Sequence, residues 1–187
     1  NIVELRGDAL LNGRPLNAQQ TIQTGDAVQT GPGSNLIFVV GSSAYHLRQN
    51  TSITIDRGDT INTVSILRLL TGAVASVWGR GSYRQINTPT LTAGIRGTGV
   101  YTEVRPEENL RSYFCNCYGT VELAAAEDRT VSRASYHQSF WAEPAPRNGQ
   151  RLTFAPAINH TDEELEFLPG LVDQRTACQV CGLRGSK

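Results

Sequence analysis

Short apolar runs separated by turn residues make up most of the chain. Residues 36–40 form a continuous apolar run that ends at Gly41, and residues 52–55 alternate polar and apolar side chains. Glycine, asparagine and aspartate interrupt such runs about every eight to ten residues, and alternation with a period of two residues indicates strands. The pattern therefore predicts a mainly β domain, built either as an irregular β-solenoid or as a sandwich-like fold.

The pattern changes near the end of the chain. Thr161 is followed by three acidic residues, a capping-box arrangement that predicts the start of a short helix. A CxxC pattern follows this helix. We therefore divide the chain into a β domain, residues 1–125, and a C-terminal extension, residues 126–187, which contains a strand, a loop, the short α-helix and the CxxC tail.

Charge and composition narrow the possible functions. Lysine and arginine together number 17, as do aspartate and glutamate, so the formal net charge is zero. This balance argues against a nucleic-acid partner, because nucleic-acid binders carry a basic excess. No apolar run is long enough to predict a membrane-spanning segment in this chain. The chain contains no methionine, not even at position 1, so we expect that its beginning has been lost. Removal of a signal peptide or membrane anchor is compatible with this, although neither is visible.

A stretch at mid-chain combines one proline, three glycines and one arginine, and we expect five of its residues to have structural roles. Pro89 fixes its own backbone, and Gly94 and Gly97 allow a positive φ or a close approach of neighbouring chain. Arg96, followed by Gly97 and Thr98, is expected to be buried and to donate to carbonyls freed at a turn, which would join neighbouring strands. Anion or ligand binding by Arg96 is the alternative.

Several segments, in this order along residues 1–125, resemble the FecR family. Residues 25–31 match its Gly-Asp-x-Val-x-Thr-Gly signature, although Val40 stands where the following strand usually has aspartate. Residues 67–74 match its Leu-x-x-Gly-x-Val strand, and residues 88–98 match the signature that begins with Thr-Pro and ends with Ile-Arg-Gly-Thr. The order and spacing of the segments carry the resemblance.

The resemblance implies a bacterial β domain that is periplasmic, secreted or held at the cell surface. The best-known members are the periplasmic part of a regulator of iron uptake, and others are fused to adhesion or peptidoglycan-binding modules. We therefore expect a non-enzymatic domain that binds a protein partner or a component of the cell envelope, in envelope signalling or in extracellular assembly. Open strand edges would also permit self-assembly.

Four cysteines offer the most distinctive chemistry of the chain. Cys115 and Cys117 lie two residues apart in a predicted strand and so point to the same face. If Cys178 and Cys181 met them, the four thiolates would suit zinc or another thiophilic metal, and His137 and His160 are further candidate ligands. The chain would then be a metal-binding sensor or carrier.

Disulfide bonds are the competing interpretation of the same cysteines. An oxidising compartment favours them, and pairing the CxC strand with the CxxC tail would anchor the C-terminal extension to the β domain. A redox-active CxxC is a third interpretation, although the thioredoxin-like surroundings of such motifs are missing. No nucleophile elbow, phosphate-binding loop or paired-carboxylate motif is present, so we expect that the protein is not an enzyme.

Overall fold

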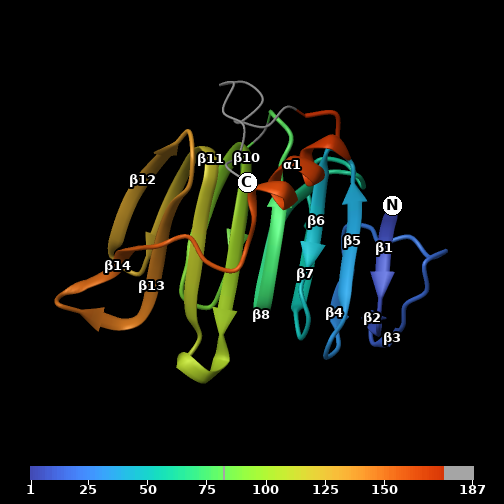
Figure 1. Ribbon diagram of the computed structural model, residues 1–187, viewed down its shortest axis with the longest axis horizontal. Coiled ribbons are helices and arrows are strands. Elements are labelled where there is room, and N and C mark those ends of the chain that lie inside the picture. Colours follow the sequence, from blue (N-terminus) through green and yellow to red (C-terminus); the bar gives the residue numbers. More distant parts are fainter. Residues whose placement is uncertain (82, 175–187) are drawn as a thin grey trace.

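The computed structural model describes residues 1–81 and 83–174, which fold as two layers of strands with one helix on the outside (Figure 1). The mainly β prediction with a short C-terminal helix is confirmed, in the sandwich-like form, and the sheet is not closed into a barrel. The strands are β1 (Ile2–Arg6), β2 (Ala9–Leu11), β3 (Arg14–Pro15), β4 (Ala27–Thr30), β5 (Asn35–Val40), β6 (Ser43–Leu47), β7 (Ser52–Arg57), β8 (Val64–Val77), β9 (Arg84–Asn87), β10 (Thr92–Arg105), β11 (Arg111–Ala125), β12 (Asp128–Ala134), β13 (Gln138–Arg147) and β14 (Gln150–Ala155). A 3₁₀ turn, η1 (Pro106–Glu108), joins β10 to β11, and the helix is α1 (Asp162–Gly170).

Three long strands, β8, β10 and β11, belong to both layers. The first half of β8 pairs with β7, and its second half pairs with β6 and β10. The second half of β10 pairs with the first half of β11, which continues to β13 and β14. The front layer is thus β1, β5, β6, β8, β10, β11, β13 and β14, and strands β4 and β7 lie behind β5 and β6 in Figure 1.

Glycines mark the points where the long strands bend from one layer to the other. Gly72 in β8 has φ +87°, and a Cβ there would lie 2.5 Å from the Cα of Thr51. Gly119 in β11 has φ +101°, and its Cβ would lie 2.6 Å from Cγ2 of Thr98. A side chain at either position would therefore meet both backbone strain and a steric clash.

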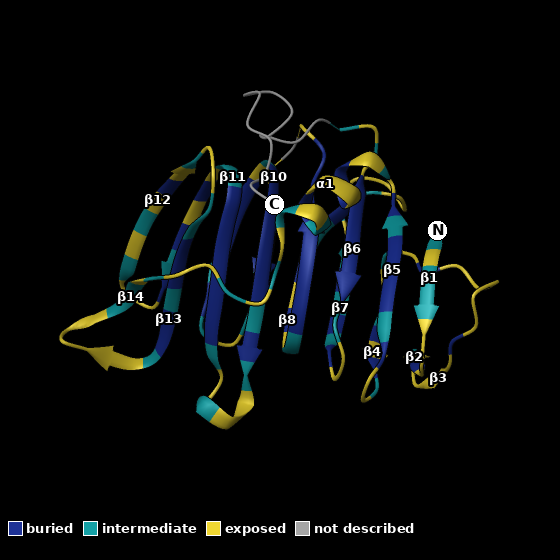
Figure 2. Cartoon of the chain, in the orientation of Figure 1, coloured by how far each residue is buried: buried dark blue, intermediate teal, exposed yellow. Residues whose placement is uncertain are grey.

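Two apolar clusters result from this arrangement. The inner core fills the space between the layers, and Trp78, Phe38 and Phe114 are among its fully buried side chains. The outer cluster lies on the other face of the front layer, beneath α1, and includes Tyr101 and Tyr113. Figure 2 shows the buried residues concentrated along the central strands. Because side chains alternate along β10 and β11, each strand contributes to both clusters.

The mid-chain stretch forms the turn from β9 to β10 and the first half of β10. Gly97 has φ +62°, the positive φ that we expected. Gly94 has no positive φ and no close backbone neighbour, but a Cβ there would lie 2.3 Å from the Tyr83 hydroxyl. Thr98 is fully buried. Pro89 lies in the turn, where the Thr88 amide donates to the Leu91 carbonyl over 2.8 Å.

The expectation that Arg96 is buried is wrong. Ile95 points into the inner core, so the alternation of the strand turns Arg96 outward, where its side chain is exposed. Its guanidinium carbon lies 5.7 Å from the centre of the Tyr83 ring. Arg96 therefore contacts an aromatic ring at the surface instead of bonding to buried carbonyls.

The predicted helix start is confirmed. The Thr161 side chain accepts a hydrogen bond from the Glu164 amide, and the acidic first turn lies at the positive end of the helix. Pro169 lies in the last turn, and the helix ends at Gly170. The division at residue 125 stays a prediction, and β12 and β13, which follow it, both pair with β11. Within the described part of the chain, no helix is both long and apolar enough to cross a membrane.

Candidate metal centre

Four side chains from three separate parts of the chain converge on the outer face of the front layer. Cys115 and Cys117 come from β11, His137 from the turn between β12 and β13, and His160 from the segment just before α1. One ligand atom from each lies within 4.8 Å of the others. The two sulfurs are 3.6 Å apart, Cys115 Sγ is 3.3 Å from His137 Nδ1, and His137 Nδ1 is 3.1 Å from His160 Nε2.

The strand geometry places the two thiols together. Tyr113, Cys115 and Cys117 all belong to the outer cluster, whereas Phe114, between them, lies in the inner core. This outcome confirms the prediction that the CxC cysteines share one face. Both are free thiols and both are buried, with 0% and 3% of their surface exposed.

The backbone at His137 is held in an unusual conformation. Its φ is +36°, which is rare for a residue other than glycine, and its amide donates to the Cys117 carbonyl over 3.1 Å. Eight other non-glycine residues in the described part of the chain also have a positive φ, so the conformation by itself marks a turn. Here the turn directs the imidazole back over β11 toward the thiols.

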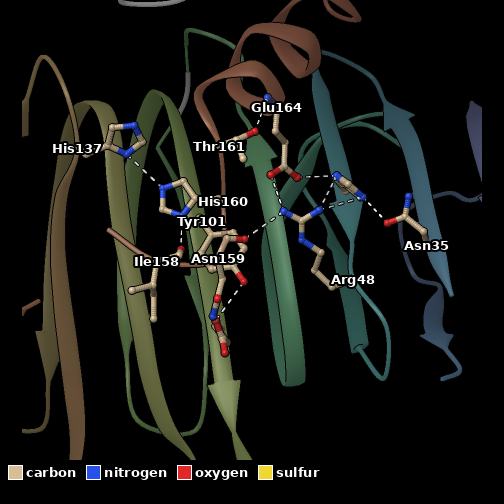
Figure 3. A network of polar contacts seen from close by, with 11 residues as sticks. Asn35, Arg48, Tyr101, His137, Ile158, Asn159, His160, Thr161 and Glu164 are labelled. Carbon is tan, nitrogen blue, oxygen red and sulfur yellow. Dashed lines mark hydrogen bonds and ion pairs between the residues drawn. The ribbon is translucent and has the colours of Figure 1, made fainter. Parts of the chain in front are cut away.

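The nitrogen of each histidine that faces away from the thiols has a hydrogen-bond acceptor. His137 Nε2 lies 2.9 Å from Asp162 Oδ1, and His160 Nδ1 lies 2.6 Å from the Ile158 carbonyl oxygen. The His160 ring also stacks on Tyr101, with the ring centres 4.8 Å apart. Figure 3 shows the two imidazoles facing each other in front of the strands. An acceptor on each outward nitrogen favours the tautomers whose inward nitrogens, His137 Nδ1 and His160 Nε2, can bind a cation. Without a cation, His137 Nδ1 shares a hydrogen bond with Cys115 Sγ instead.

The distances fit a tetrahedral ion. Zinc bonds of about 2.3 Å to sulfur and about 2.0–2.1 Å to nitrogen place the ligand atoms about 3.3–3.8 Å from one another. The three shortest of the six separations are 3.1, 3.3 and 3.6 Å, close to these values, and the others lie within 4.8 Å, so small shifts of the side chains would complete the tetrahedron. Two cysteines and two histidines are also a donor set that zinc commonly takes. The residues therefore fit a thiophilic or borderline cation.

The electrostatics favour a thiolate at this place. The hydrogen bond with Cys117 and those with the two histidines lower the pKa of Cys115 to about 3. Burial and the neighbouring Cys115 thiolate raise the pKa of Cys117. Burial opposes the charged form of His137, but hydrogen bonds to Cys115 and Asp162 outweigh it and raise the pKa of this histidine. A bound cation would replace these shared protons, because metal ligands must be deprotonated.

The cluster also contains a Cys–His–Asp sequence of contacts, Cys115 to His137 to Asp162, of the kind that activates a nucleophile. A nucleophile must be reached by its substrate, and Cys115 has no exposed surface. Four inward-facing donors fill a tetrahedral site and leave no position for a substrate or a water. The arrangement is therefore better suited to holding an ion than to catalysis.

Not all of the predicted ligands can be placed. Cys178 and Cys181 lie outside the described residues, so their predicted pairing or ligation stays a prediction. Asp162 orients His137, and Tyr101, which supports His160, was not predicted as part of the centre. Both contacts depend on how α1 and the segment before it pack on the front layer, for which the local sequence has no marker.

A second polar group lies beside the metal centre, under the first turn of α1. Glu164 contacts His46 Nδ1 and Arg48 Nη2, each at 2.5 Å, and the guanidinium of Arg48 lies 6.0 Å from the centre of the Tyr101 ring. Burial raises the pKa of Glu164, but His46 and Arg48 outweigh it, and the pKa lies below its ordinary value. This ion group, visible in Figure 3, joins α1 to β6 and to the residue that follows β6.

The fold and the four-ligand cluster together define a β-sandwich domain with a candidate metal centre on one face. Two crystal structures, each described as a "putative anti-sigma factor" from Parabacteroides distasonis ATCC 8503, are similar in fold. One has a TM-score of 0.57 at 11% identity and covers 69% of this chain and 58% of that chain. The other has a TM-score of 0.56 at 14% identity and covers 72% and 60%.

The match therefore spans less than two thirds of either solved chain. At these identities the likeness concerns the fold alone. No protein-family model matches the chain. No curated protein matches it either.

Proposed function

We propose that this domain binds one zinc ion, or another thiophilic cation, through Cys115, Cys117, His137 and His160. The observation that carries the proposal is the convergence of four ligand atoms within 4.8 Å, each histidine being held by an acceptor on its outer nitrogen. Metal-binding histidines nearly always have such a partner on the outer nitrogen, which fixes the orientation of the ring.

The ion would have a structural or sensing role. Its four ligands come from β11, from the turn between β12 and β13, and from the segment before α1, so the ion would connect parts of the chain that are distant in sequence. A closed and buried tetrahedral site of this type contributes folding energy and does not activate water. The ligand set is complete without Cys178 and Cys181.

Metal content tests the proposal. Full-length protein, purified without chelators and reconstituted with Zn²⁺ or Co²⁺, is expected to hold one equivalent, and the cobalt form should show the absorption of a tetrahedral thiolate site. Cys115→Ser and His137→Ala should lose this ion or its tetrahedral spectrum. The double variant Cys178→Ser/Cys181→Ser is the matched control and should retain both. Absence of metal from the wild type, or loss of the metal in the control alone, would contradict the proposed site.

A second function concerns partners. We propose that the domain is the extracytoplasmic, FecR-like part of a regulatory or signalling protein and that it binds a protein partner. The order of FecR-type segments along the chain supports this proposal, as does the fold similarity to the two structures described as "putative anti-sigma factor". Deletion of the coding sequence in its source organism should change transcription of a defined gene set, measured by RNA sequencing. An unchanged transcriptome under metal-replete and metal-depleted growth would argue against this role.

A further inference from the structure

We infer that occupancy of the metal centre controls whether the docked segment, residues 156–172, stays on the outer face of the front layer. The inference rests on the proposed metal binding and adds to it the regulation of the helix. In Figure 1, α1 lies across the ends of β8 and β6. His160 is the ligand that lies in this segment, whereas Cys115, Cys117 and His137 belong to the sheet and its hairpin.

The helix has little to hold it in place by itself. It has nine residues, of which Leu165, Leu168 and Pro169 are buried, while Phe167 is 50% exposed. Isolated helices of this length are not stable in water, so tertiary contacts must fix both its conformation and its position. Ile158, Leu171 and Val172, at the two ends of the segment, also pack against the outer cluster, yet the whole apolar contact is small compared with the inner core.

Polar contacts supply most of the remaining attachment, and they are concentrated before and within the first turn. The Tyr113 hydroxyl bonds to the Pro156 carbonyl and to the Ile158 amide at 2.7 and 3.0 Å. Asn159 donates to Glu103 over 3.0 Å, and Glu164 contacts Arg48. The ion would add a bond to His160 in the middle of this polar series.

Loss of the ion should act on His160 first. Without a cation, the two sulfurs and two ring nitrogens are joined only by hydrogen bonds, the three closest of 3.1–3.6 Å, which hold His160 less firmly than a bond to the ion would. Cys115 and Cys117 are fixed in the centre of a strand that pairs on both sides. Movement of His160 with its segment is therefore the least costly response to loss of the ion. The helix α1 begins two residues after His160 and would move with it.

Release of the docked segment would change the surface of the domain. Alanines, tyrosines and one isoleucine of the outer cluster would lose apolar cover: Ile37, Ala44, Ala73, Ala75, Tyr101 and Tyr113. An uncovered apolar face is the usual mark of an interaction surface. Metal binding would thus decide whether this face is exposed to solvent.

Hydrogen–deuterium exchange on the full-length protein tests the inference, with Zn²⁺ alone as the probe. In the zinc-loaded protein, amides of 162–170 should be protected. After removal of zinc by a chelator they should exchange at least about tenfold faster, while peptides from β8 and β10 keep their protection. Equal exchange of α1 in the two states, with zinc binding demonstrated, would overturn the inference and leave the proposed metal site intact. Failure to bind zinc at all would overturn both.

The variant His160→Ala removes the bond between the docked segment and the ion. It tests the inference even if the metal-free wild type unfolds as a whole. Cys115, Cys117 and His137 remain, so the variant should still bind zinc, more weakly. Faster exchange of α1 in this zinc-loaded variant, with β8 and β10 unchanged, would support the inference. Protection of α1 equal to that of the wild type would contradict it. Glu163→Gln, an exposed change in the same helix, is the matched control and should alter neither zinc content nor exchange.

Discussion

The inner core and the outer cluster are built on the same strands, yet different interactions stabilise them. The inner core consists of large, fully buried apolar side chains between two layers, such as Trp78 and Phe114. The outer cluster combines alanines and tyrosines with thiols, histidines and an ion group, and a nine-residue helix covers part of it. Because apolar burial needs no ligand, the stability of the inner core should not depend on a bound metal. That of the outer cluster should depend on the metal and on pH.

The largest effect should come from the inner core. Phe114→Ala removes a fully buried ring from the space between the layers and should lower the free energy of unfolding by about 3–5 kcal/mol. Phe154→Ala, at a ring that is 77% exposed, is the matched control and should change it by less than about 0.5 kcal/mol. Chemical denaturation of the zinc-loaded and zinc-free proteins measures both. If zinc changed the loss of unfolding free energy caused by Phe114→Ala several-fold, the inner core and the outer cluster would not be independent.

The metal should stabilise the outer region next most strongly. Free Zn²⁺ at a hundred times its dissociation constant should raise the free energy of unfolding by about 2.7 kcal/mol. Cys115→Ser should sharply reduce this increment at the same zinc concentration because it removes a ligand, whereas Cys178→Ser should preserve it. Thermal denaturation across a zinc titration is the measurement. If zinc raised the free energy of unfolding of Cys115→Ser as much as that of the wild type, the ion would bind elsewhere.

The ion group beneath α1 should have an intermediate effect that depends on pH. Glu164→Gln leaves His46 and Arg48 without their carboxylate and should cost about 1–3 kcal/mol at neutral pH. The folded-state pKa of Glu164 lies below its ordinary value of 4.5, so its contribution is complete above that value. The contribution is lost as the pH falls through the lower folded-state pKa.

Acid titration of stability therefore distinguishes the ion group from general acid unfolding. The difference in free energy of unfolding between wild type and Glu164→Gln should shrink as the pH falls below 4.5. Glu163→Gln should follow the wild type at every pH, since this side chain is exposed. A difference that is constant with pH would show that the ionised carboxylate contributes nothing.

The smallest effect is expected at the surface of the mid-chain stretch. Arg96→Ala removes an exposed guanidinium that lies over the Tyr83 ring and should cost about 0.5–1 kcal/mol at most. Metal content and exchange of α1 should not change. If Arg96→Ala lowered the free energy of unfolding by several kcal/mol, the result would support the buried role that the sequence predicts for Arg96.

The sequence predicts the local features well. The two-residue alternation correctly places Cys115 and Cys117 on one face, and Thr161 with its acidic successors correctly predicts the helix start. The same alternation, applied to β10, would have predicted that the Arg96 side chain points outward. Its neighbouring glycines suggested a turn at this point, whereas the chain continues as a bent strand.

The convergence of the four ligands could not be predicted with the same certainty. His137 reaches Cys115 across 22 residues of sequence, and it does so because β12 and β13 both pair with β11. His160 lies 23 residues further on and returns over the sheet after β14. Such distances depend on strand order and layer geometry, which residue spacing does not specify. The sequence therefore identifies these histidines as candidate ligands, and the fold brings them next to the two cysteines.

X-ray absorption spectroscopy of the zinc-loaded, full-length protein tests the central claim most directly, because it counts the ligand atoms. The account predicts a shell of two sulfurs at about 2.3 Å and two nitrogens at about 2.0–2.1 Å, with the outer-shell signal of imidazole. A shell of four sulfurs would show that Cys178 and Cys181 are ligands in place of His137 and His160. That result, or a protein that takes up no zinc, would contradict the account.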